Sequence, residues 1–377
     1  MKAPLRRVAK LSGTMTEGEF SPLVSMENSV SYHPSRPSPL DAVHVAAGAA
    51  FTDFAGWKMP VRYGSDLAEH ETVRTAAGLF DLSHMAEFLI GGTHAAAFLD
   101  AALAGRASAI PVGRAKYSLL LAEDGGILDD LVVYRLGEQR YWVVANAANH
   151  DVVAATLAGR RADFDVTLDD ETDTCALIAI QGPASAGIVE ALGLPTDLRY
   201  YGIAEATYGD TPVLVARTGY TGEDGFELYL DASAAPALWN DLVAAGAVPC
   251  GLAARDTLRL EAGMPLYGHE LTRATRPVEA GLGRISDAST PGARVLVGLT
   301  AEGKRAGRAG YPVLRDGEVV GEITSGALSP TLGIPIAMAY VDADASAVGT
   351  ELDLDVRGTA IPARVVALPF YSRKAVS

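Results

Sequence analysis

The spacing of strand patterns between Ala115 and Asn146 is the feature that most restricts the fold of this chain. Three runs rich in aliphatic and aromatic residues, Ala115–Leu121, Ile127–Leu136 and Arg140–Asn146, are separated only by the turn sequences EDGG and GEQ. Turns this short join antiparallel neighbours, whereas parallel strands need a crossover of about a dozen residues or more. The pattern therefore predicts an antiparallel meander and disfavours a doubly wound parallel sheet.

The rest of the chain contains further strand and helix patterns. After about Pro277, short strands alternate with turn signals and no helical pattern intervenes, which is typical of a small β-barrel or sandwich. The expected fold is therefore α+β, with antiparallel sheets and a C-terminal β-barrel-like module. Further predicted segments are a loop followed by a strand over Gly78–Ile90, strands over Ala176–Gln181, Thr211–Arg217 and Phe226–Leu230, and helices over Thr93–Ala104, His150–Leu157, Pro236–Gly246 and Leu252–Ala262.

Length and composition limit the class of protein. A chain of 377 residues, of which 49% are hydrophobic, is long enough for two or three domains. Its formal charge of −15 argues against nonspecific binding to nucleic acid or to an anionic membrane, and no apolar run reaches the ~18 residues of a membrane span. Two cysteines, Cys175 and Cys250, suggest neither a disulfide framework nor a cysteine zinc site. We expect a cytoplasmic globular protein.

Changes in composition place the expected domain boundaries. Residues 1–37 begin with a basic segment and continue rich in Ser, Pro and Glu. We interpret them as a disordered extension, or as sequence upstream of a later start such as Met26, and a transit peptide is a weaker alternative. The α+β patterns divide into an N-terminal domain over residues 38–170 and a second domain over 171–285, and the β-rich segment defines a third domain over 286–377.

One acidic residue is unusual in the strand Ile127–Leu136. Side chains alternate between the two faces of a strand, so Asp129 and Asp130 point in opposite directions. The face of Asp130 is otherwise apolar, and burial there would raise the pKa of Asp130 and suit a functional carboxyl group. The competing interpretation is an acid that is solvated at a strand edge or paired with an arginine. Asp129 shares a mixed face and fits a structural partner. The apolar residues on the Asp130 face are Leu128, Val132, Tyr134 and Leu136.

Two further charged residues are candidates for ligand binding. On the strand Phe226–Leu230, Glu227 points away from the apolar face, and its carboxylate suits a flat heterocycle with an amino-pyrimidinone edge. The alternative is a solvated outer face. Arg255 lies in the first turn of a predicted helix, where a cation opposes the helix dipole and needs a nearby anion. That anion is either a ligand or a side chain such as Asp256 or Glu261.

Other sequence signals are weaker. The seven histidines show no spacing typical of a metal site, so we expect no metal. No Walker A, GxGxxG or GxSxG pattern occurs in a suitable context. Several tyrosines, each a packing residue when taken alone, together suit the walls of a slot for an aromatic ligand: Tyr117, Tyr134, Tyr200, Tyr201 and Tyr220.

Several longer motifs occur in one order along the chain. They are FAGWKMPVRYGS, GLFDLSHM, GGILDDLVVY, ALIAIQGP, RTGYTGEDGFEL, GLAARDTLRLEAGMPLYGHEL and TRPVEAGLGR. From about Pro39 to Phe370 the chain therefore closely resembles the T-protein of the glycine cleavage system, an aminomethyltransferase family. The resemblance implies a folate-binding fold in which three domains surround the folate site, the first of them being the N-terminal α+β domain.

The resemblance also implies a reaction in glycine catabolism and one-carbon metabolism. A lipoylated carrier, the H-protein, delivers an aminomethyl group on its dihydrolipoyl sulfur, and tetrahydrofolate accepts the carbon as co-substrate, without a metal. The products are ammonia, 5,10-methylenetetrahydrofolate and the reduced carrier. The implied partners are the H-protein and other components of the glycine cleavage system, and neither nucleic acid nor membrane.

Matching positions carry the family's roles onto this chain. Asp130, second in the DD pair, matches the catalytic aspartate, as an electrostatic or general-base partner of the reacting nitrogens. Glu227 in GFEL matches the pterin-binding glutamate, and Arg255 in AARD matches the ligand-binding arginine. Further folate-lining positions implied by the resemblance are Met85, Tyr117, Tyr134, Val144, Asn146, Tyr220 and, near the C-terminus, Arg373.

Two other functions use domains of this kind. A folate-dependent demethylation module follows a flavin-binding domain with a dinucleotide fingerprint, for which this chain is too short. A folate-binding accessory protein of iron–sulfur cluster assembly carries a cysteine near the end of the Arg255 helix, where this chain reads EAGMPLYGHEL. A transferase should turn over aminomethylated carrier with tetrahydrofolate, whereas an accessory protein should bind folate without that turnover.

Overall fold

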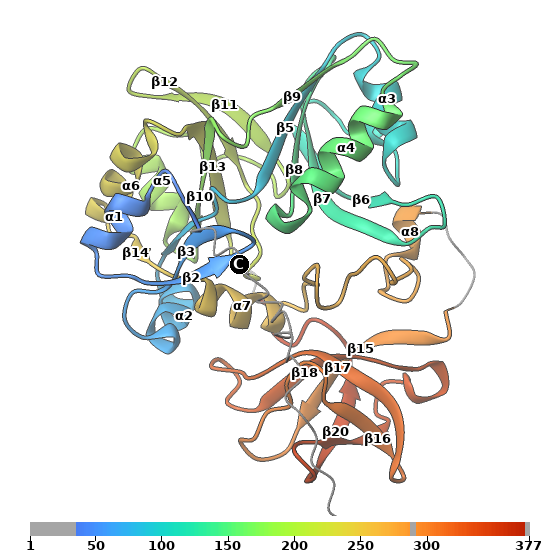
Figure 1. The fold of residues 1–377 in the computed structure, drawn as a ribbon. Helices are drawn as coiled ribbons and strands as arrows, with labels where there is room; N and C mark the ends of the chain where they lie inside the picture. Colours follow the sequence, from blue (N-terminus) through green and yellow to red (C-terminus); the bar gives the residue numbers. More distant parts are fainter. Residues whose placement is uncertain (1–34, 287–291, 374–377) are drawn as a thin grey trace, which may run out of the picture. The chain divides into compact units, whose positions relative to one another are not determined.

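A computed structural model describes residues 35–286 and 292–373 of the chain, and Figure 1 shows how their helices and strands are arranged. In this part of the chain the strands form two larger sheets, a three-stranded sheet and a closed barrel. The expected α+β fold of mainly antiparallel sheets with a C-terminal β-barrel is confirmed. Residues 1–34 of the predicted extension lie outside the described residues. Arg36–Pro37, which the prediction also assigned to the extension, form strand β1 and pair with Trp57–Lys58.

The first large sheet contains the predicted meander. In spatial order its strands are β6 (Arg114–Leu121), β7 (Ile127–Gly137), β8 (Arg140–Ala145), β5 (Ala86–Gly91) and β9 (Thr167–Asp170). The three predicted strands are thus confirmed as β6, β7 and β8, with ends within one residue of those expected. Helices α3 (Ala95–Ala102) and α4 (His150–Arg160) cover one face, where Phe98 and Leu157 pack in the same core as Val133 of β7. Short 3-10 helices are η1 (Ala107–Ala109) and η2 (Ala147–Asn149).

The second large sheet is assembled from segments that are far apart in sequence. In spatial order its strands are β11 (Ile203–Tyr208), β12 (Thr211–Ala216), β13 (Gly225–Asp231), β10 (Cys175–Gln181), β4 (Gly78–Asp81) and β14 (Val248–Pro249). Helices on its outer face are α1 (Asp41–Ala46), α5 (Ser185–Ala191) and α6 (Ala235–Ala244). Phe226 and Leu228 of β13 share a core with Leu238 and Trp239 of α6, which confirms the apolar face predicted for this strand.

The segment Gly78–Ile90 differs from its prediction. Its first part is a strand and not a loop, and β4 belongs to the second sheet whereas β5 belongs to the first. β4 is buried because it lies between β10 and β14, and a Cβ at Gly78 would lie only 2.4 Å from Val73 Cγ2. The glycine therefore permits close packing and does not mark a turn. One tight turn, in which Met85 N–H donates to Leu82 O at 2.9 Å, joins the two sheets. β4 thus lies before the domain boundary predicted at residue 170, but it belongs to the sheet formed mainly by strands after that boundary.

The two large sheets meet through an aromatic layer. Tyr229 of β13 contacts Tyr134 of β7 and Trp142 of β8 edge to face, with ring centroids 5.8 Å and 6.1 Å apart. All three rings are at least nine-tenths buried, so the layer contributes much of the apolar contact between the sheets. The face of β7 that carries Asp130 and the face of β13 that carries Glu227 consequently look into the same space.

Smaller elements complete the part of the chain before the barrel. β3 (Trp57–Arg62) pairs with both β1 and β2 (Ala50–Phe54) in the three-stranded sheet, and α2 (Asp66–Thr75) follows them. Helix α7 (Leu252–Glu261) confirms the helix predicted there, and a short helix, α8 (Gly283–Ser286), ends this region. Across residues 35–286 and 292–373, no helix combines the length and the apolar character needed to cross a membrane.

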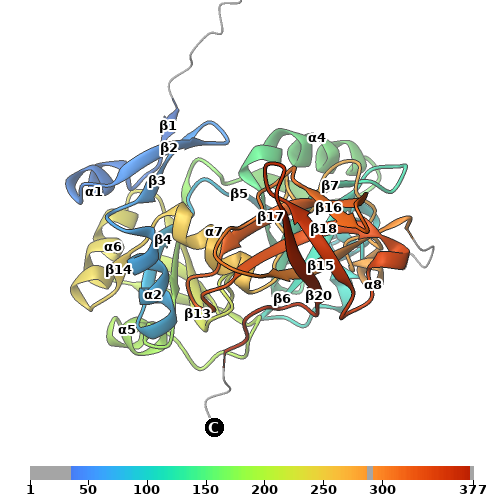
Figure 2. The same cartoon turned by 90° about the horizontal axis from the view of Figure 1, so that it is seen from below.

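The C-terminal segment forms a closed six-stranded barrel, seen from another direction in Figure 2. Its interior is aliphatic, with Val313, Ile323 and Leu354 among the buried side chains. In circular order its strands are β15 (Arg294–Ala301), β18 (Pro335–Asp342), β17 (Glu318–Leu328), β16 (Pro312–Arg315), β19 (Glu351–Asp355) and β20 (Ala360–Val366), and η3 (Ala343–Ala345) follows β18.

Candidate functional site

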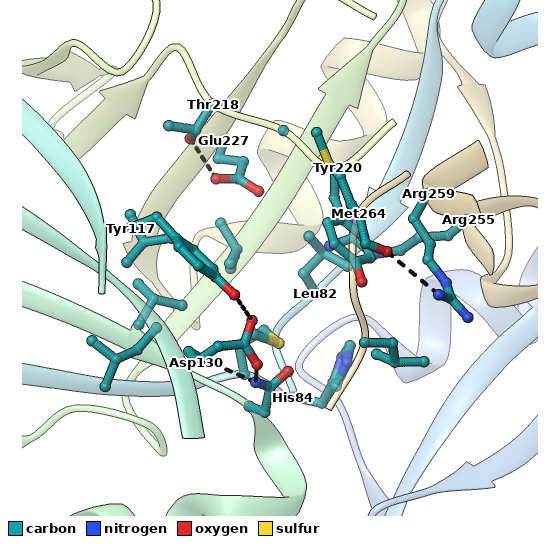
Figure 3. Close-up of a pocket in the computed structure, with 18 of the residues that line it drawn as sticks. Leu82, His84, Tyr117, Asp130, Thr218, Tyr220, Glu227, Arg255, Arg259 and Met264 are labelled. Carbon is teal, nitrogen blue, oxygen red and sulfur yellow. Dashed lines mark hydrogen bonds between the residues drawn. The ribbon is translucent and has the colours of Figure 1, made fainter. Parts of the chain in front are cut away.

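A cavity of about 520 Å³ lies between the inner faces of the two large sheets and the beginning of α7 (Figure 3). Asp130 and Glu227 face it from different sheets, and Arg255 reaches it from α7. The structure thus brings together predicted site residues that are scattered between positions 85 and 255. The predicted residues that line the cavity are Met85, Tyr117, Asp130, Tyr134, Val144, Asn146, Tyr220, Glu227 and Arg255.

Arg373, the predicted folate contact near the C-terminus, does not line this cavity. Its Nη1 lies 3.2 Å from Asp224 Oδ1, and Asp224 also accepts from Arg217 Nε at 2.9 Å. The backbone before it is held on α7, where Tyr371 N–H donates to Glu261 O at 2.8 Å. These contacts direct the end of the described chain to the GEDG loop, which is why Arg373 stands apart from the other predicted residues.

Asp130 faces the cavity from β7, an inner strand of its sheet, and so is not an edge residue. Its Oδ2 accepts from the Tyr117 hydroxyl at 3.0 Å, and its Oδ1 accepts from Asn146 Nδ2 at 2.9 Å. Burial raises the pKa of Asp130 to about 6, and these two hydrogen bonds oppose the rise because they stabilise the ionised form. Its partners among the described residues are thus a tyrosine and an asparagine, and not an arginine.

The Asp130 face differs from its prediction at Leu128. Leu120 of β6 opposes Asp129, whereas the next residue, Leu121, opposes Ile127, so Leu128 is the extra residue of a β-bulge. Leu128 consequently packs against the core under α3 and α4 and not toward the cavity. The other predicted members of the Asp130 face belong to the core between the two sheets: Val132, Tyr134 and Leu136.

Glu227 faces the cavity from β13. Its Oε2 accepts from the hydroxyls of Thr218 and Tyr134, the latter at 3.3 Å. Because the first sheet covers this side of β13, the solvated outer face considered for Glu227 is not what the structure contains. In the described part of the chain, no hydrogen bond reaches the second carboxylate oxygen, which leaves it available to a ligand.

Arg255 is a half-buried cation at the start of α7. Its guanidinium lies over the ring of Tyr220, 4.9 Å from the ring centroid, and its buried Nη1 has no hydrogen-bond partner among the described residues. Burial lowers the pKa of Arg255, and the charge of Glu227 opposes that change. A buried N–H without an acceptor is costly, so this guanidinium is suited to an acceptor that a bound ligand would bring.

The first acid considered as a partner of Arg255 is bound by another arginine. Asp256 Oδ1 lies 2.8 Å from Arg259 Nη2, and Arg259 Nη1 lies 2.9 Å from Glu270 Oε2. Arg259 is 1% exposed and is therefore the structural ion-pair residue of this helix. The ion pair that was an alternative for Arg255 is thus made by its neighbour one turn later.

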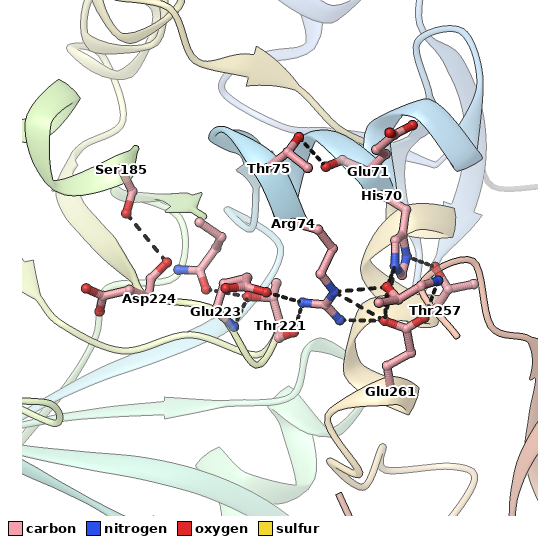
Figure 4. Close-up of polar contacts among 12 residues, drawn as sticks. His70, Glu71, Arg74, Thr75, Ser185, Thr221, Glu223, Asp224, Thr257 and Glu261 are labelled. Carbon is pink, nitrogen blue, oxygen red and sulfur yellow. Dashed lines mark hydrogen bonds and ion pairs between the residues drawn. The ribbon is translucent and has the colours of Figure 1, made fainter. Parts of the chain in front are cut away.

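The second acid, Glu261, is the centre of a buried cluster that joins α7 and α2 to the barrel (Figure 4). Its Oε2 lies 2.7 Å from Arg74 Nη2 and 3.1 Å from His70 Nε2. Its Oε1 accepts from Thr331 N–H at 3.0 Å and from the Ser329 hydroxyl, both in the connection between β17 and β18. Burial alone would raise the pKa of Glu261, but the hydrogen bonds from His70, Ser329 and Arg74, together with the charge of His70, lower that pKa to about 2.

Sequence reasoning misses several residues of the cavity wall. His84, in the turn between β4 and β5, is 4% exposed, and its buried Nδ1 has no hydrogen-bond partner within residues 35–286 and 292–373. Burial lowers the pKa of His84 to about 4, so its imidazole is neutral at pH 7. His84 directly precedes Met85, a predicted wall residue, and this position could have identified His84 as part of the cavity wall. Considering the histidines only as metal ligands does not reveal it. Tyr201, one of the tyrosines expected to wall a slot, does line the cavity, whereas Tyr200 does not. Other wall residues absent from the predicted folate-lining set are Leu82, Thr218, Arg259 and Met264.

The chemistry of the cavity is that of a site for a flat, polar molecule. One side offers a carboxylate acceptor, another offers an arginine donor, and tyrosine rings lie between them. Asp130 stands apart from this pair with its own hydrogen bonds, so it can act on a reacting group. Within the described ranges, no three or more His, Cys, Asp or Glu side chains are grouped so that they could hold a metal ion.

Comparisons with known proteins agree with this geometry. The family model described as GCVT N-terminal domain matches residues 40–289, and the one described as Glycine cleavage T-protein C-terminal barrel domain matches residues 294–372. An aminomethyltransferase of Cutibacterium acnes is 55% identical over 366 residues, which cover 90% of this chain and 99% of that protein. An aminomethyltransferase of Streptomyces avermitilis is 54% identical over 368 residues, which cover 90% of this chain and 98% of that protein.

A solved structure shares the fold. The crystal structure of the glycine cleavage system aminomethyltransferase T from Bartonella henselae matches with a TM-score of 0.84 and 37% sequence identity, covering 89% of this chain and 98% of that chain. The matches therefore include the two large sheets as well as the barrel. On these grounds the chain belongs to the glycine cleavage T-protein family of aminomethyltransferases.

Proposed function

We propose that this chain transfers the carbon of an aminomethyl group from the dihydrolipoyl sulfur of a lipoylated H-protein to tetrahydrofolate, with release of ammonia. The observation that carries the proposal is the presence of Asp130, Glu227 and Arg255 in one cavity walled by aromatic rings, with Arg255 Nη1 lacking a hydrogen-bond partner among the described residues. The similarity to proteins named aminomethyltransferase, over 90% of this chain, supports the reaction class. In this proposal Glu227 and Arg255 bind the folate, and Asp130 interacts with the charges that develop during the reaction.

The side chains of the cavity fit the pterin of tetrahydrofolate. Its amino-pyrimidinone ring is flat and carries both N–H donors and acceptors along its edge. Glu227 would accept from the donors, and Arg255 Nη1, which lacks a partner in the described chain, would donate to an acceptor. Tyr220, which lies under the Arg255 guanidinium, would extend the aromatic contact with the ring.

In this proposal Asp130 is the residue that acts on the reacting atoms. One nitrogen of tetrahydrofolate bonds to the aminomethyl carbon, and ammonia leaves with the electron pair of its own bond to that carbon. A second nitrogen of tetrahydrofolate then bonds to the same carbon, and the dihydrolipoyl sulfur leaves as a thiolate with the electron pair of the carbon–sulfur bond. A half-buried carboxylate stabilises the positive charge that develops at the carbon. The same carboxylate can accept the proton that the attacking nitrogen loses. Both roles require the ionised form, which the hydrogen bonds from Tyr117 and Asn146 favour.

An ammonia-release assay with aminomethylated H-protein, run with and without tetrahydrofolate, tests the proposal. We expect folate-dependent release by the wild-type protein. Asp130→Asn should lower turnover by about 100-fold or more while leaving folate affinity measurable by calorimetry. The matched control is Asp151→Asn, which changes a fully exposed carboxylate on α4. A wild-type protein that binds tetrahydrofolate but releases no ammonia from the loaded carrier would contradict the proposal and favour a folate-binding accessory protein.

A further inference from the structure

Asp129, the neighbour of Asp130, is a buried carboxylate with three hydrogen bonds. It is 0% exposed and points to the side of β7 opposite the cavity. Its Oδ2 accepts from the backbone N–H of Asn146 at 2.9 Å, and its Oδ1 accepts from Asn146 Nδ2 at 2.8 Å and Asn149 Nδ2 at 2.6 Å. The structural role expected of Asp129 therefore has identifiable partners, and two of the three donors belong to one residue of the cavity wall.

Asn146 connects Asp129 with Asp130. Its Nδ2 lies 2.8 Å from Asp129 Oδ1, 2.9 Å from Asp130 Oδ1 and 3.0 Å from the backbone oxygen of Asp130. One amide group, with two hydrogens, is thus shared among acceptors on both acids. Asn146 directly follows β8 and lines the cavity. Its orientation therefore sets the direction in which the Asp130 carboxylate receives a hydrogen bond.

Asn149 also donates to Asp129, but its other contacts differ from those of Asn146. Asn149 ends η2 and donates to Asp129, and in the described part of the chain it neither bonds to Asp130 nor lines the cavity. Asn146, in contrast, uses both its backbone N–H and its side chain on Asp129 while it also contacts Asp130. Closing the turn after β8 would require only the first of these contacts.

We propose that Asp129 is a positioning residue, which holds Asn146 and through it the direction of the catalytic Asp130 carboxylate. The inference deepens the proposed transferase function, on which its kinetic consequence rests. Asp129 itself is separated from the cavity by the backbone of β7 and does not touch a ligand there. Asp129 would affect the reaction only through the side chain of Asn146, so removing that side chain tests the inference directly.

The substitution Asp129→Asn keeps the shape of the side chain and replaces one oxygen by an NH2 group. If the NH2 replaces Oδ2, it faces the backbone N–H of Asn146. If it replaces Oδ1, it faces Asn146 Nδ2 and Asn149 Nδ2. In either orientation the new NH2 group faces an N–H donor of Asn146, where the wild-type carboxylate offers an acceptor. Two donors repel each other, so we expect Asn146 to be displaced in both orientations.

The kinetic test is a double-mutant cycle between Asp129→Asn and Asn146→Ala. Asp129→Asn should lower kcat by about 100-fold, the size expected when a reacting group is displaced by about 1 Å, with little change in KM for tetrahydrofolate. In the Asn146→Ala background it should have almost no further effect, because the path to Asp130 is already removed. Independent, additive losses of kcat would overturn the inference. So would a wild-type kcat in Asn146→Ala, a result that needs no folded variant at position 129.

The matched control is Asn149→Ala, which removes a donor from the same carboxylate oxygen. It should reduce stability and leave kcat close to the wild-type value. A loss of kcat in Asn149→Ala as large as that in Asp129→Asn would mean that general loosening of this region, and not Asn146, affects the reaction, and the inference would fall.

A structural readout separates this inference from the proposed function. In a crystal structure of Asp129→Asn we expect Asn146 Nδ2 to lie beyond hydrogen-bond distance of Asp130 Oδ1, about 3.5 Å, whereas Asn149→Ala should keep the contact. An unchanged contact in Asp129→Asn would overturn the positioning role. This measurement requires no turnover, whereas failure of the proposed function would appear in the ammonia assay of the wild-type protein.

Discussion

Replacing Glu261 by glutamine should destabilise the protein by about 3 kcal/mol at pH 7. Glu261 is 0% exposed, and its hydrogen bonds together with the charge of His70 outweigh the effect of burial and lower its pKa from 4.5 to about 2. The two pKa values of Glu261 differ by about 2.5, which corresponds to about 3.4 kcal/mol at ~1.36 kcal/mol per pKa unit. Breaking a buried ion pair typically costs about 3–5 kcal/mol. Because Arg74 keeps Glu223 at 3.0 Å, we expect the lower end of that range.

The pH dependence has a definite sign. The pKa of Glu261 is lower in the folded protein than in the unfolded chain, so its contribution is fully present above pH 4.5 and is lost as the pH falls toward about 2. The stability difference between the wild-type protein and Glu261→Gln should therefore shrink in acid. The group is uncharged in both proteins once the wild-type carboxylate is protonated.

Urea unfolding at pH 7, followed by two spectroscopic probes, measures the effect. The matched control is Glu71→Gln on α2, an exposed carboxylate close to the cluster in sequence, for which we expect a change within about 0.5 kcal/mol. If Glu261→Gln loses less than about 1 kcal/mol relative to Glu71→Gln, the reasoning from the buried cluster is wrong, because replacing a buried carboxylate that contacts both Arg74 and His70 should cost more than that.

Three further predictions concern the cavity and the helix that carries its arginine. Turnover should fall as the pH drops through about 6, to which burial raises the pKa of Asp130, and a flat pH–rate profile across that value would contradict its role. Arg255→Ala and Glu227→Gln should each weaken tetrahydrofolate binding by about 10- to 100-fold in calorimetry, and unchanged affinity would refute their placement. Gly251→Ala should destabilise the protein by about 1–3 kcal/mol. The added Cβ would lie 2.3 Å from the backbone of Val61, so an unaltered urea midpoint would show that α7 can shift freely.

The parts of the fold that follow from local pattern are the parts that sequence reasoning finds. The meander strands and α7 carry apolar residues at a regular period, and short turns determine which strands are neighbours. Strand β4 does not have this property. Four residues are too few to show a period, and β4 is a strand because β10 and β14 flank it from distant parts of the sequence.

The candidate site likewise has some features that local sequence patterns reveal and others that depend on contacts between distant segments. Asp130 and Glu227 are recognisable from their residue type, their strand face and the family resemblance, but only the packing of the two sheets brings them into one cavity. The bulge at Leu128 leaves no sequence signal, because one extra residue in a strand does not alter composition. Arg373 is captured by Asp224, a contact that depends on the path of the last residues. His84 is overlooked because a neutral buried imidazole has no characteristic spacing.

The tight turn between β4 and β5 has a consequence for synthesis of the protein. On the ribosome β4 emerges first, then the whole meander up to Asp170, and only afterwards β10, against which β4 pairs. The meander depends on contacts within its own segment, so a nascent chain can complete it while β4 still lacks a neighbour. Glu227 and Arg255 arrive later still. A polypeptide that ends after Asp170 would therefore contain Asp130 and the cavity-wall residues of the first sheet, but neither Glu227 nor Arg255.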